Sequence, residues 1–253
     1  MNPEPDMNPA SPTSADDAPA ELTTTRLVVV SAGTSDPSST RQLADRIAQT
    51  ALDRLNAAGG PATASVIELG PLAVDIAQAT VAGFPNQRLQ AAIDRLAAAD
   101  AIIAATPVYK AGISGLFKSF VDLLDNDLLV AKPVLLAATG GTGRHALVID
   151  DQMRPLFAYM RALILPTSVY AAPEDWGSNE LSTRIERAVV ELTVMVRAAV
   201  ERQIADGAWS RYQHPLGGNA TRAEQTLADL DFDSPLMRLA AGGSHKPAEG
   251  DGA

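Results

Sequence analysis

Short apolar runs alternate with longer amphipathic segments from residue 26 onward. The runs are rich in Val, Ile, Leu and Ala, and this composition predicts strands of a parallel sheet that is buried on both faces. The predicted strands are residues 27–30, 64–69, 101–105, 133–138 and 164–171. Elsewhere apolar residues recur every three or four positions, which predicts helices. The predicted helices are residues 38–58, 87–98, 116–124, 153–163 and 181–200. This alternation of strands and helices indicates an α/β fold with right-handed crossovers.

Both ends of the chain differ in composition from the part between them. Residues 1–25 are rich in Pro, Ala, Ser, Thr and Asp, so they predict a disordered leader that cannot bury enough apolar surface to fold. Residues 26–205 carry the alternating pattern and form the predicted domain. Residues 206–253 have a weaker pattern and are expected to be a partly disordered C-terminal extension.

Charge and composition exclude several classes of function. A formal net charge of −10 disfavours a nucleic-acid partner. The absence of cysteine excludes disulfides and thiolate chemistry, and three widely spaced histidines make no recognisable metal motif. No apolar run approaches the roughly 18 residues of a membrane span. We therefore expect no metal, no membrane segment and a cytoplasmic protein.

The first candidate segment follows the first predicted strand and is rich in hydroxyl groups. Ser31, Ser38, Ser39 and Thr40 lie where a helix begins, and a helix N-terminus with added hydroxyl donors suits an anion such as a monophosphate. The segment matches neither a Walker A sequence nor the glycine fingerprint of dinucleotide-binding folds. The same residues also fit an ordinary N-capped turn. Arg41 is either a counter-ion for a phosphate or an exposed side chain.

The second candidate segment, residues 106–118, follows the third predicted strand. We expect it to be a loop at the carboxyl end of that strand, where open α/β sheets bind ligands. Pro107, Val108, Tyr109 and Lys110 begin the segment, and glycines follow at positions 112 and 115. A fixed backbone, an aromatic face and glycines suit a flat ring. The alternative is a turn whose tyrosine packs against the next helix.

The third candidate segment follows the fourth predicted strand and contains three glycines. Thr139, Gly140, Gly141 and Gly143 offer backbone N–H groups to a ligand, although many such segments are simple turns. Arg144 is a cation that suits a phosphate of a ligand, and His145 either assists it or begins a helix.

Together the three segments resemble NAD(P)H-dependent FMN reductases, a branch of the flavodoxin-like fold, over residues 26–171. The resemblance implies a doubly wound, five-stranded parallel sheet in the order 2-1-3-4-5, flanked by helices. It also implies that Ser31, Ser38, Ser39 and Thr40 hold the FMN phosphate. Pro107, Val108, Tyr109 and Lys110 would line the flavin, and Thr139, Gly140, Gly141 and Gly143 its ring edge. Asp36 and Pro37 depart from the pattern, because many relatives place an arginine there.

The resemblance is strongest to flavin reductases that supply reduced flavin to separate luciferase-like monooxygenases. It implies hydride transfer from NAD(P)H to FMN without a catalytic side chain, in a homodimer or homotetramer. A quinone or azo reductase that retains FMN, and a non-enzymatic flavodoxin-type electron carrier, remain as alternatives. Flavin release would separate the first two, and unaided NADPH oxidation would separate an enzyme from a carrier.

Overall fold

One sheet of seven strands runs through the computed structural model, which describes residues 24–209. The strands are β1 (Thr25–Ser31), β2 (Ala62–Glu68), β3 (Ala101–Tyr109), β4 (Gly112–Ile113), β5 (Pro133–Thr139), β6 (Leu163–Ile164) and β7 (Val169–Ala171). The main path is β2-β1-β3-β5-β6, with β7 also paired to β5 and β4 paired to β3. Every pair is parallel except β3–β4. The predicted α/β parallel sheet is therefore confirmed.

The predicted count of five strands is wrong for two local reasons. The expected fifth strand, residues 164–171, is split into β6 and β7, and both of these pair with β5. Pro166 lies between them and lacks the N–H group that a continuous ladder would need. The other additional strand, β4, is a two-residue strand that folds back on β3.

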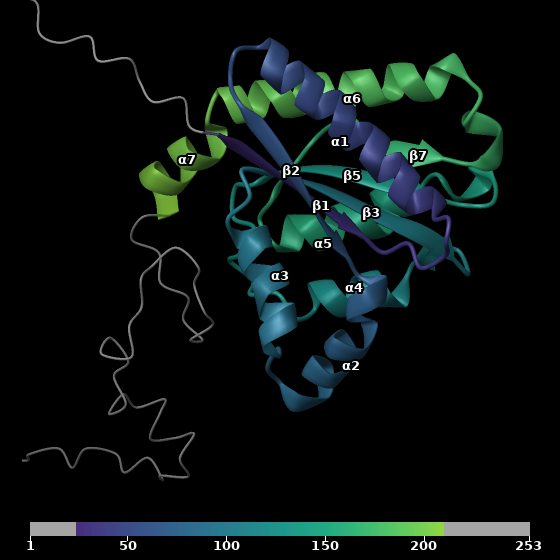
Figure 1. Ribbon diagram of the computed structural model, residues 1–253, viewed down its shortest axis with the longest axis vertical. Coiled ribbons are helices and arrows are strands. Elements are labelled where there is room, and N and C mark those ends of the chain that lie inside the picture. Colours follow the sequence, from purple (N-terminus) through teal and green to yellow (C-terminus); the bar gives the residue numbers. More distant parts are fainter. Residues whose placement is uncertain (1–23, 210–253) are drawn as a thin grey trace, which may run out of the picture.

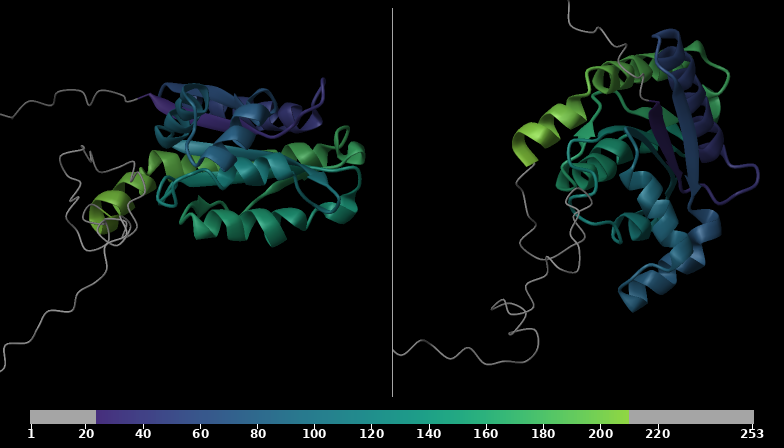
Figure 2. Two further views of the ribbon diagram at one scale, coloured as in Figure 1. Left: turned by 90° about the horizontal axis from the view of Figure 1, so that it is seen from below. Right: turned by 60° about the vertical axis from the view of Figure 1, so that its left-hand side comes forward.

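Helices cover both faces of this sheet (Figures 1 and 2). The helices are α1 (Ser39–Ala57), α2 (Ala73–Ala82), α3 (Gln87–Ala97), α4 (Gly115–Val121), α5 (Arg154–Tyr159), α6 (Asn179–Arg197) and α7 (Val200–Ile204). Buried residues of α1 and α6 pack on one face, and those of α2, α3, α4 and α5 pack on the other. The sequence pattern did not predict α2, and the predicted helix at 181–200 ends as α6 at Arg197.

The first strand shows why the apolar runs are continuous. Leu27 and Val29 belong to the core beneath α1 and α6, whereas Val28 and Val30 belong to the core on the opposite face. Successive side chains of a strand point to opposite faces, so a strand covered on both faces needs an apolar residue at every position. All four residues are accordingly buried.

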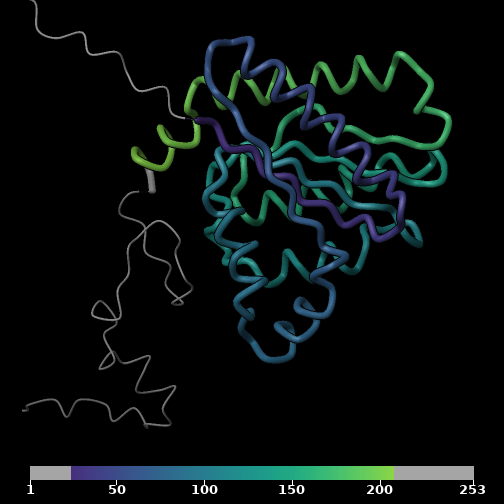
Figure 3. Tube along the Cα trace, viewed as in Figure 1, coloured from purple at the N-terminus to yellow at the C-terminus, as the bar shows by residue number. Residues whose placement is uncertain are grey.

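Helices α1 and α6 are far apart in the sequence but lie side by side (Figure 3). The Ser38 hydroxyl caps α1 by accepting a hydrogen bond from the Arg41 N–H at 3.2 Å, as expected for serine before a helix. An Arg46 guanidinium nitrogen donates to the Ser182 hydroxyl at 2.7 Å and joins the two helices. This hydrogen bond therefore holds the first half of α1 against the first turn of α6.

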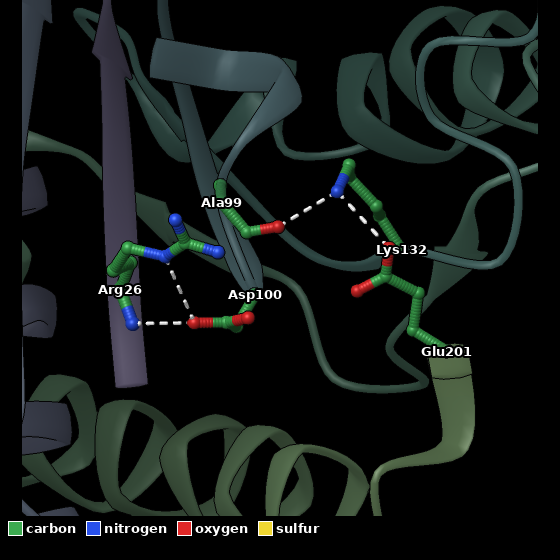
Figure 4. Close-up of polar contacts among 5 residues, drawn as sticks. All are labelled: Arg26, Ala99, Asp100, Lys132 and Glu201. Carbon is green, nitrogen blue, oxygen red and sulfur yellow. Dashed lines mark hydrogen bonds and ion pairs between the residues drawn. The ribbon is translucent and has the colours of Figure 1, made fainter. Parts of the chain in front are cut away.

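A charged cluster lies at the opposite, amino-terminal edge of the sheet (Figure 4). Lys132 is buried, and its Nζ donates to the Ala99 carbonyl oxygen at 2.7 Å and to Glu201 Oε1 at 3.0 Å. The Arg26 N–H donates to Asp100 Oδ2 at 2.7 Å beside it. Because Glu201 lies in α7, the buried ion pair attaches that helix to the sheet. A cavity of about 540 Å³ at this edge is lined by residues of this cluster.

The predicted domain division is described only in part. Residues 1–23 of the predicted leader and residues 210–253 of the predicted extension lie outside the described residues. Between these limits, the left-handed backbone of Ala199 (φ 47°) separates α6 from α7, and the short helix η5 (Ala205–Trp209) follows. None of the helices between residues 24 and 209 is long and apolar enough to cross a membrane.

Candidate functional site at the carboxyl edge of the sheet

The three candidate segments meet at one edge of the sheet. Parallel pairing places Ser31 beside Ala105 and Pro107 beside Thr139, so β1, β3 and β5 end together. The hydroxyl oxygens of Thr40 and Thr139 lie 2.6 Å apart and share a hydrogen bond between the first and third segments. The strand register and this hydrogen bond therefore bring the three segments together.

The first segment combines hydroxyls that have partners with hydroxyls that do not. Ser38 caps α1, and a Cβ on Gly33 would lie only 1.9 Å from its Oγ, so only glycine leaves room for this cap. Thr40 is buried against Thr139. Ser39 is exposed at the first turn of α1. The Ser31 hydroxyl is buried and has no hydrogen-bond partner among the described residues. An anion at this helix N-terminus would give such a hydroxyl an acceptor.

Arg41 is engaged with carboxylates of the protein. Its Nε donates to Asp45 Oδ1 at 2.7 Å, and a second guanidinium nitrogen pairs with Glu68. The pKa of Arg41 is raised, chiefly by the hydrogen bond to Asp45, with partial burial opposing that effect. Of the two interpretations left open by the sequence, the structure therefore favours a surface side chain on the first turn over a dedicated counter-ion for a phosphate.

The second segment is a β-hairpin, so the prediction of a loop directly after residue 105 is wrong. Strand β3 continues through Pro107 to Tyr109, and β4 pairs with it in antiparallel fashion. Lys110 and Ala111 form the turn, with φ angles of 50° and 61°. Both central residues have positive φ, as in a type I′ turn, which suits the twist of a hairpin. Tyr109 is 52% exposed beside this turn.

The base of the hairpin is fixed by hydroxyl groups. The Thr106 hydroxyl accepts a hydrogen bond from the Ser114 N–H at 3.1 Å, and the Ser114 hydroxyl caps α4 by accepting from the Phe117 N–H. Both hydroxyl-bearing residues are buried. The hairpin therefore leaves the sheet and enters α4 along a defined path, although its tip is exposed.

The third segment is supported by a tyrosine that the sequence pattern did not single out. The Tyr170 hydroxyl donates to the Thr142 carbonyl oxygen at 2.6 Å, and a Cβ on Gly140 would lie only 2.1 Å from that hydroxyl. Burial, followed by the negative charges of Glu174 and Asp175, raises the pKa of Tyr170. From the sequence, Tyr170 could have been identified only by its position in the predicted fifth strand, and that strand is split in the structure.

The N–H groups of the glycines in the third segment differ in availability. The Gly140 N–H donates to the Ala171 carbonyl oxygen at 3.2 Å, and the Gly143 N–H donates to Glu174 Oε1 at 3.3 Å. Gly141 is exposed, and its N–H makes no hydrogen bond to another described residue. Arg144 is exposed without an ion pair in the described part of the chain, and His145 is half-buried in η2 (Gly143–His145). Gly141 and Arg144 are therefore the groups of this segment that remain open to a ligand.

The groups at this edge that are open to a ligand are hydroxyls, backbone N–H groups, the exposed ring of Tyr109 and the exposed cations Lys110 and Arg144. No group of three His, Asp or Glu side chains that could hold a metal ion occurs among residues 24–209. Such an edge can bind a phosphate at the helix N-terminus and hold a flat ring against the hairpin. Any redox step would then be supplied by bound cofactors, with the protein providing position and electrostatics.

Known proteins with similar sequences and structures point to the same chemistry. Residues 25–177 match the model of the NADPH-dependent FMN reductase family. An FMN reductase (NADPH) of Pseudomonas aeruginosa is 37% identical over 70% of this chain and 89% of its own length. The NADH-dependent FMN reductase SfnE of Pseudomonas putida is 35% identical over 70% of this chain and 90% of its own length.

Two solved structures agree with these sequence relatives. An oxidoreductase from Corynebacterium diphtheriae has 43% identity and a TM-score of 0.67, covering 69% of this chain and 98% of its own. The apo form of the NADH:FMN oxidoreductase EMOB has 26% identity and a TM-score of 0.59, covering 67% of this chain and 89% of its own. The chain therefore belongs to the NADPH-dependent FMN reductase family and is an NAD(P)H:FMN oxidoreductase.

Proposed function

We propose that the carboxyl edge of the sheet binds FMN, that NAD(P)H reduces it there, and that reduced flavin leaves for a separate monooxygenase of the luciferase-like class. The observation that carries the site is the convergence of the three segments through the strand register and the hydrogen bond between Thr40 and Thr139. Bound FMN would supply the redox chemistry by accepting a hydride from the reduced nicotinamide.

The phosphate of FMN fits the N-terminus of α1. The exposed Ser39 hydroxyl and the N–H groups of the first turn are donors there, and the helix dipole favours a negative charge. The unpartnered hydroxyl of Ser31 supports an additional contact from the end of β1. Ser38 and Thr40 contribute chiefly by shaping the segment, because both hydroxyls already have protein partners.

The flat ring of FMN fits the hairpin, where Pro107 and Val108 lead to the exposed ring of Tyr109. On the other side, the free N–H of Gly141 is the best candidate donor to the polar ring edge. Thr139, Gly140 and Gly143 have protein partners and would form the wall behind it. Lys110 and Arg144 are exposed cations beside this position and suit the phosphates of NAD(P)H.

The test of this site compares two exposed tyrosines. Tyr109→Ala should raise the FMN dissociation constant several-fold, because an aromatic contact contributes roughly 0.5–1.5 kcal/mol beyond its buried area. Tyr159, 69% exposed on α5, provides the matched control, and Tyr159→Ala should bind FMN like the wild type. Flavin fluorescence titration measures both. Equal affinities for Tyr109→Ala and the wild type would remove the hairpin from the site.

The release of reduced flavin is supported by the openness of the hairpin. Tyr109 is the exposed aromatic residue of the three segments, because Phe117 is buried in the core, and half of the Tyr109 surface is open, which suits a flavin that leaves without a large rearrangement. A micromolar dissociation constant, about −8 kcal/mol, would allow both capture and release. We also propose a homodimer or homotetramer, which light scattering would test.

Transfer across a dialysis membrane tests release directly. Under low oxygen, the reductase with NADPH and FMN in one chamber should support a luciferase-like monooxygenase in the other. A requirement for both proteins in the same chamber would contradict a freely diffusing flavin. Ping-pong reduction of quinones with retained, non-dialysable FMN would favour the rival quinone or azo reductase.

A further inference from the structure

The turn of the β3–β4 hairpin has a backbone that its own residues disfavour. Lys110 and Ala111 both have positive φ angles, 50° and 61°, although neither is a glycine. Side chains of L-residues make this left-handed region unfavourable, so such turns usually contain Gly, Asn or Asp. Contacts from outside the turn are therefore needed to keep the hairpin in this one conformation.

Gln152 supplies those contacts from a segment 39 residues further along the chain. Its Oε1 accepts a hydrogen bond from the Ile113 N–H at 3.0 Å, and its Nε2 donates to the Ala111 carbonyl oxygen at 3.4 Å. A Cβ on Gly112 would lie 3.2 Å from the same Oε1, so the glycine leaves space for the amide. One side chain thus spans the three residues after Lys110.

The segment that carries Gln152 is itself well anchored. Gln152 lies in the helix η3 (Ile149–Met153), between Ile149 and Met153, which are both buried in the core. Arg154, the first residue after this helix, donates to the Leu165 carbonyl oxygen at 3.1 Å. The Gln152 side chain is exposed and makes no other described hydrogen bond. Its two bonds therefore connect the hairpin, whose tip is exposed, to a segment that is packed into the core.

We propose that Gln152 is a positioning residue for flavin binding: its amide holds the hairpin turn so that Tyr109 faces the bound ring. This inference rests on the proposed function, in which Tyr109 lines the flavin. Gln152 does not need to touch FMN. It acts by removing the alternative hairpin conformations that would otherwise reduce the fraction of binding-competent protein.

Three variants of the full-length chain test the proposal through the FMN dissociation constant. Gln152→Ala should weaken FMN binding roughly three- to tenfold, the usual range for losing such hydrogen bonds. Gln78→Ala is the matched control, because Gln78 is an exposed helical glutamine that makes no side-chain hydrogen bond among the described residues. It should bind FMN like the wild type. The double variant Tyr109→Ala/Gln152→Ala should bind no more weakly than Tyr109→Ala, because both changes act on the same contact.

Gln152→Glu adds a readout that general destabilisation would not produce. A carboxylate at this position can accept from the Ile113 N–H but cannot donate to the Ala111 carbonyl oxygen, whereas the protonated acid can do both. Its affinity, taken relative to the wild type at each pH, should therefore be low at pH 7. It should begin to recover below about pH 5 and regain most of the loss by about pH 4, as the glutamate, with a typical pKa of about 4.3, gains its proton.

The possible outcomes separate the two proposals. Wild-type affinity for Gln152→Ala with weakened binding for Tyr109→Ala overturns the positioning role and leaves the flavin site intact. Wild-type affinity for Tyr109→Ala overturns the ring contact, and the positioning role falls with it. Additive losses in the double variant, or a Gln152→Glu ratio that does not change with pH, would also contradict the positioning role.

Discussion

Replacing Gly140 by alanine should destabilise the protein through a clash with one atom, the Tyr170 hydroxyl. The added Cβ would lie 2.1 Å from that oxygen, which no real contact allows, and 3.2 Å from the ring carbon that bears it. The Gly140 φ angle is outside the left-handed region, so alanine fits the backbone itself. To relieve the clash the ring must move, and the hydrogen bond from Tyr170 to the Thr142 carbonyl oxygen at 2.6 Å is lost.

The expected loss in the free energy of unfolding follows from these two distances. Inserting a methyl group into a packed position costs about 1–3 kcal/mol, and Tyr170→Phe alone should cost about 1 kcal/mol for the lost hydrogen bond. In the Tyr170→Phe background the nearest atom is the ring carbon, which needs a shift of only a few tenths of an ångström. Gly140→Ala should then cost less than about 0.5 kcal/mol, because alanine also restricts the unfolded chain. The two changes should therefore couple by at least ~1 kcal/mol.

Urea denaturation of the wild type, both single variants and the double variant measures this coupling as a difference in the free energy of unfolding. The double variant should be about as stable as Tyr170→Phe alone. If the two losses add within about 0.5 kcal/mol, the Tyr170 hydroxyl is not what requires glycine at position 140. The described packing of the third segment would then be wrong.

Three further predictions concern other parts of the molecule. Burial and nearby acids raise the pKa of Tyr170 in the folded protein. The resulting stabilisation is present below the unfolded pKa of about 10.0 and is lost as the pH rises through the folded pKa. Tyr170→Phe should abolish this decline in the free energy of unfolding, as measured by urea titrations at alkaline pH. Ser39→Ala with Thr40→Ala should weaken FMN binding in fluorescence titrations, and unchanged affinity would move the phosphate elsewhere. Glu201→Gln should lower the free energy of unfolding by roughly 1.5–3 kcal/mol, because the buried Lys132 loses a charged partner. An unchanged midpoint of urea denaturation would show that this ion pair does not attach α7.

Most of the sheet was predictable because both of its faces are covered. Continuous apolar runs such as residues 27–30 have few interpretations other than a buried strand. Ser38 indicated the start of α1, because serine is a preferred N-cap residue. Helix α2 was missed because its small residues produce a weak periodic pattern. The hairpin was missed because Lys110 and Ala111 are not typical residues for a turn with positive φ angles.

The candidate site was predictable in its location but not in its internal contacts. Parallel topology alone brings the three strand ends together, so Ser31, Tyr109 and Thr139 were expected at one edge. The bond between Thr40 and Thr139 joins residues 99 positions apart, and the position of Gln152 depends on how η3 packs. Such contacts are products of tertiary packing and leave no periodic signal in a single sequence.

The most direct test of the central claim is NADPH oxidation by protein that has first been dialysed free of flavin. If the flavin is bound and released as a substrate, as we propose, almost no oxidation is expected without FMN, and the rate should rise to saturation with micromolar added FMN. Protein that keeps stoichiometric FMN through dialysis and oxidises NADPH at full rate without added flavin would contradict it.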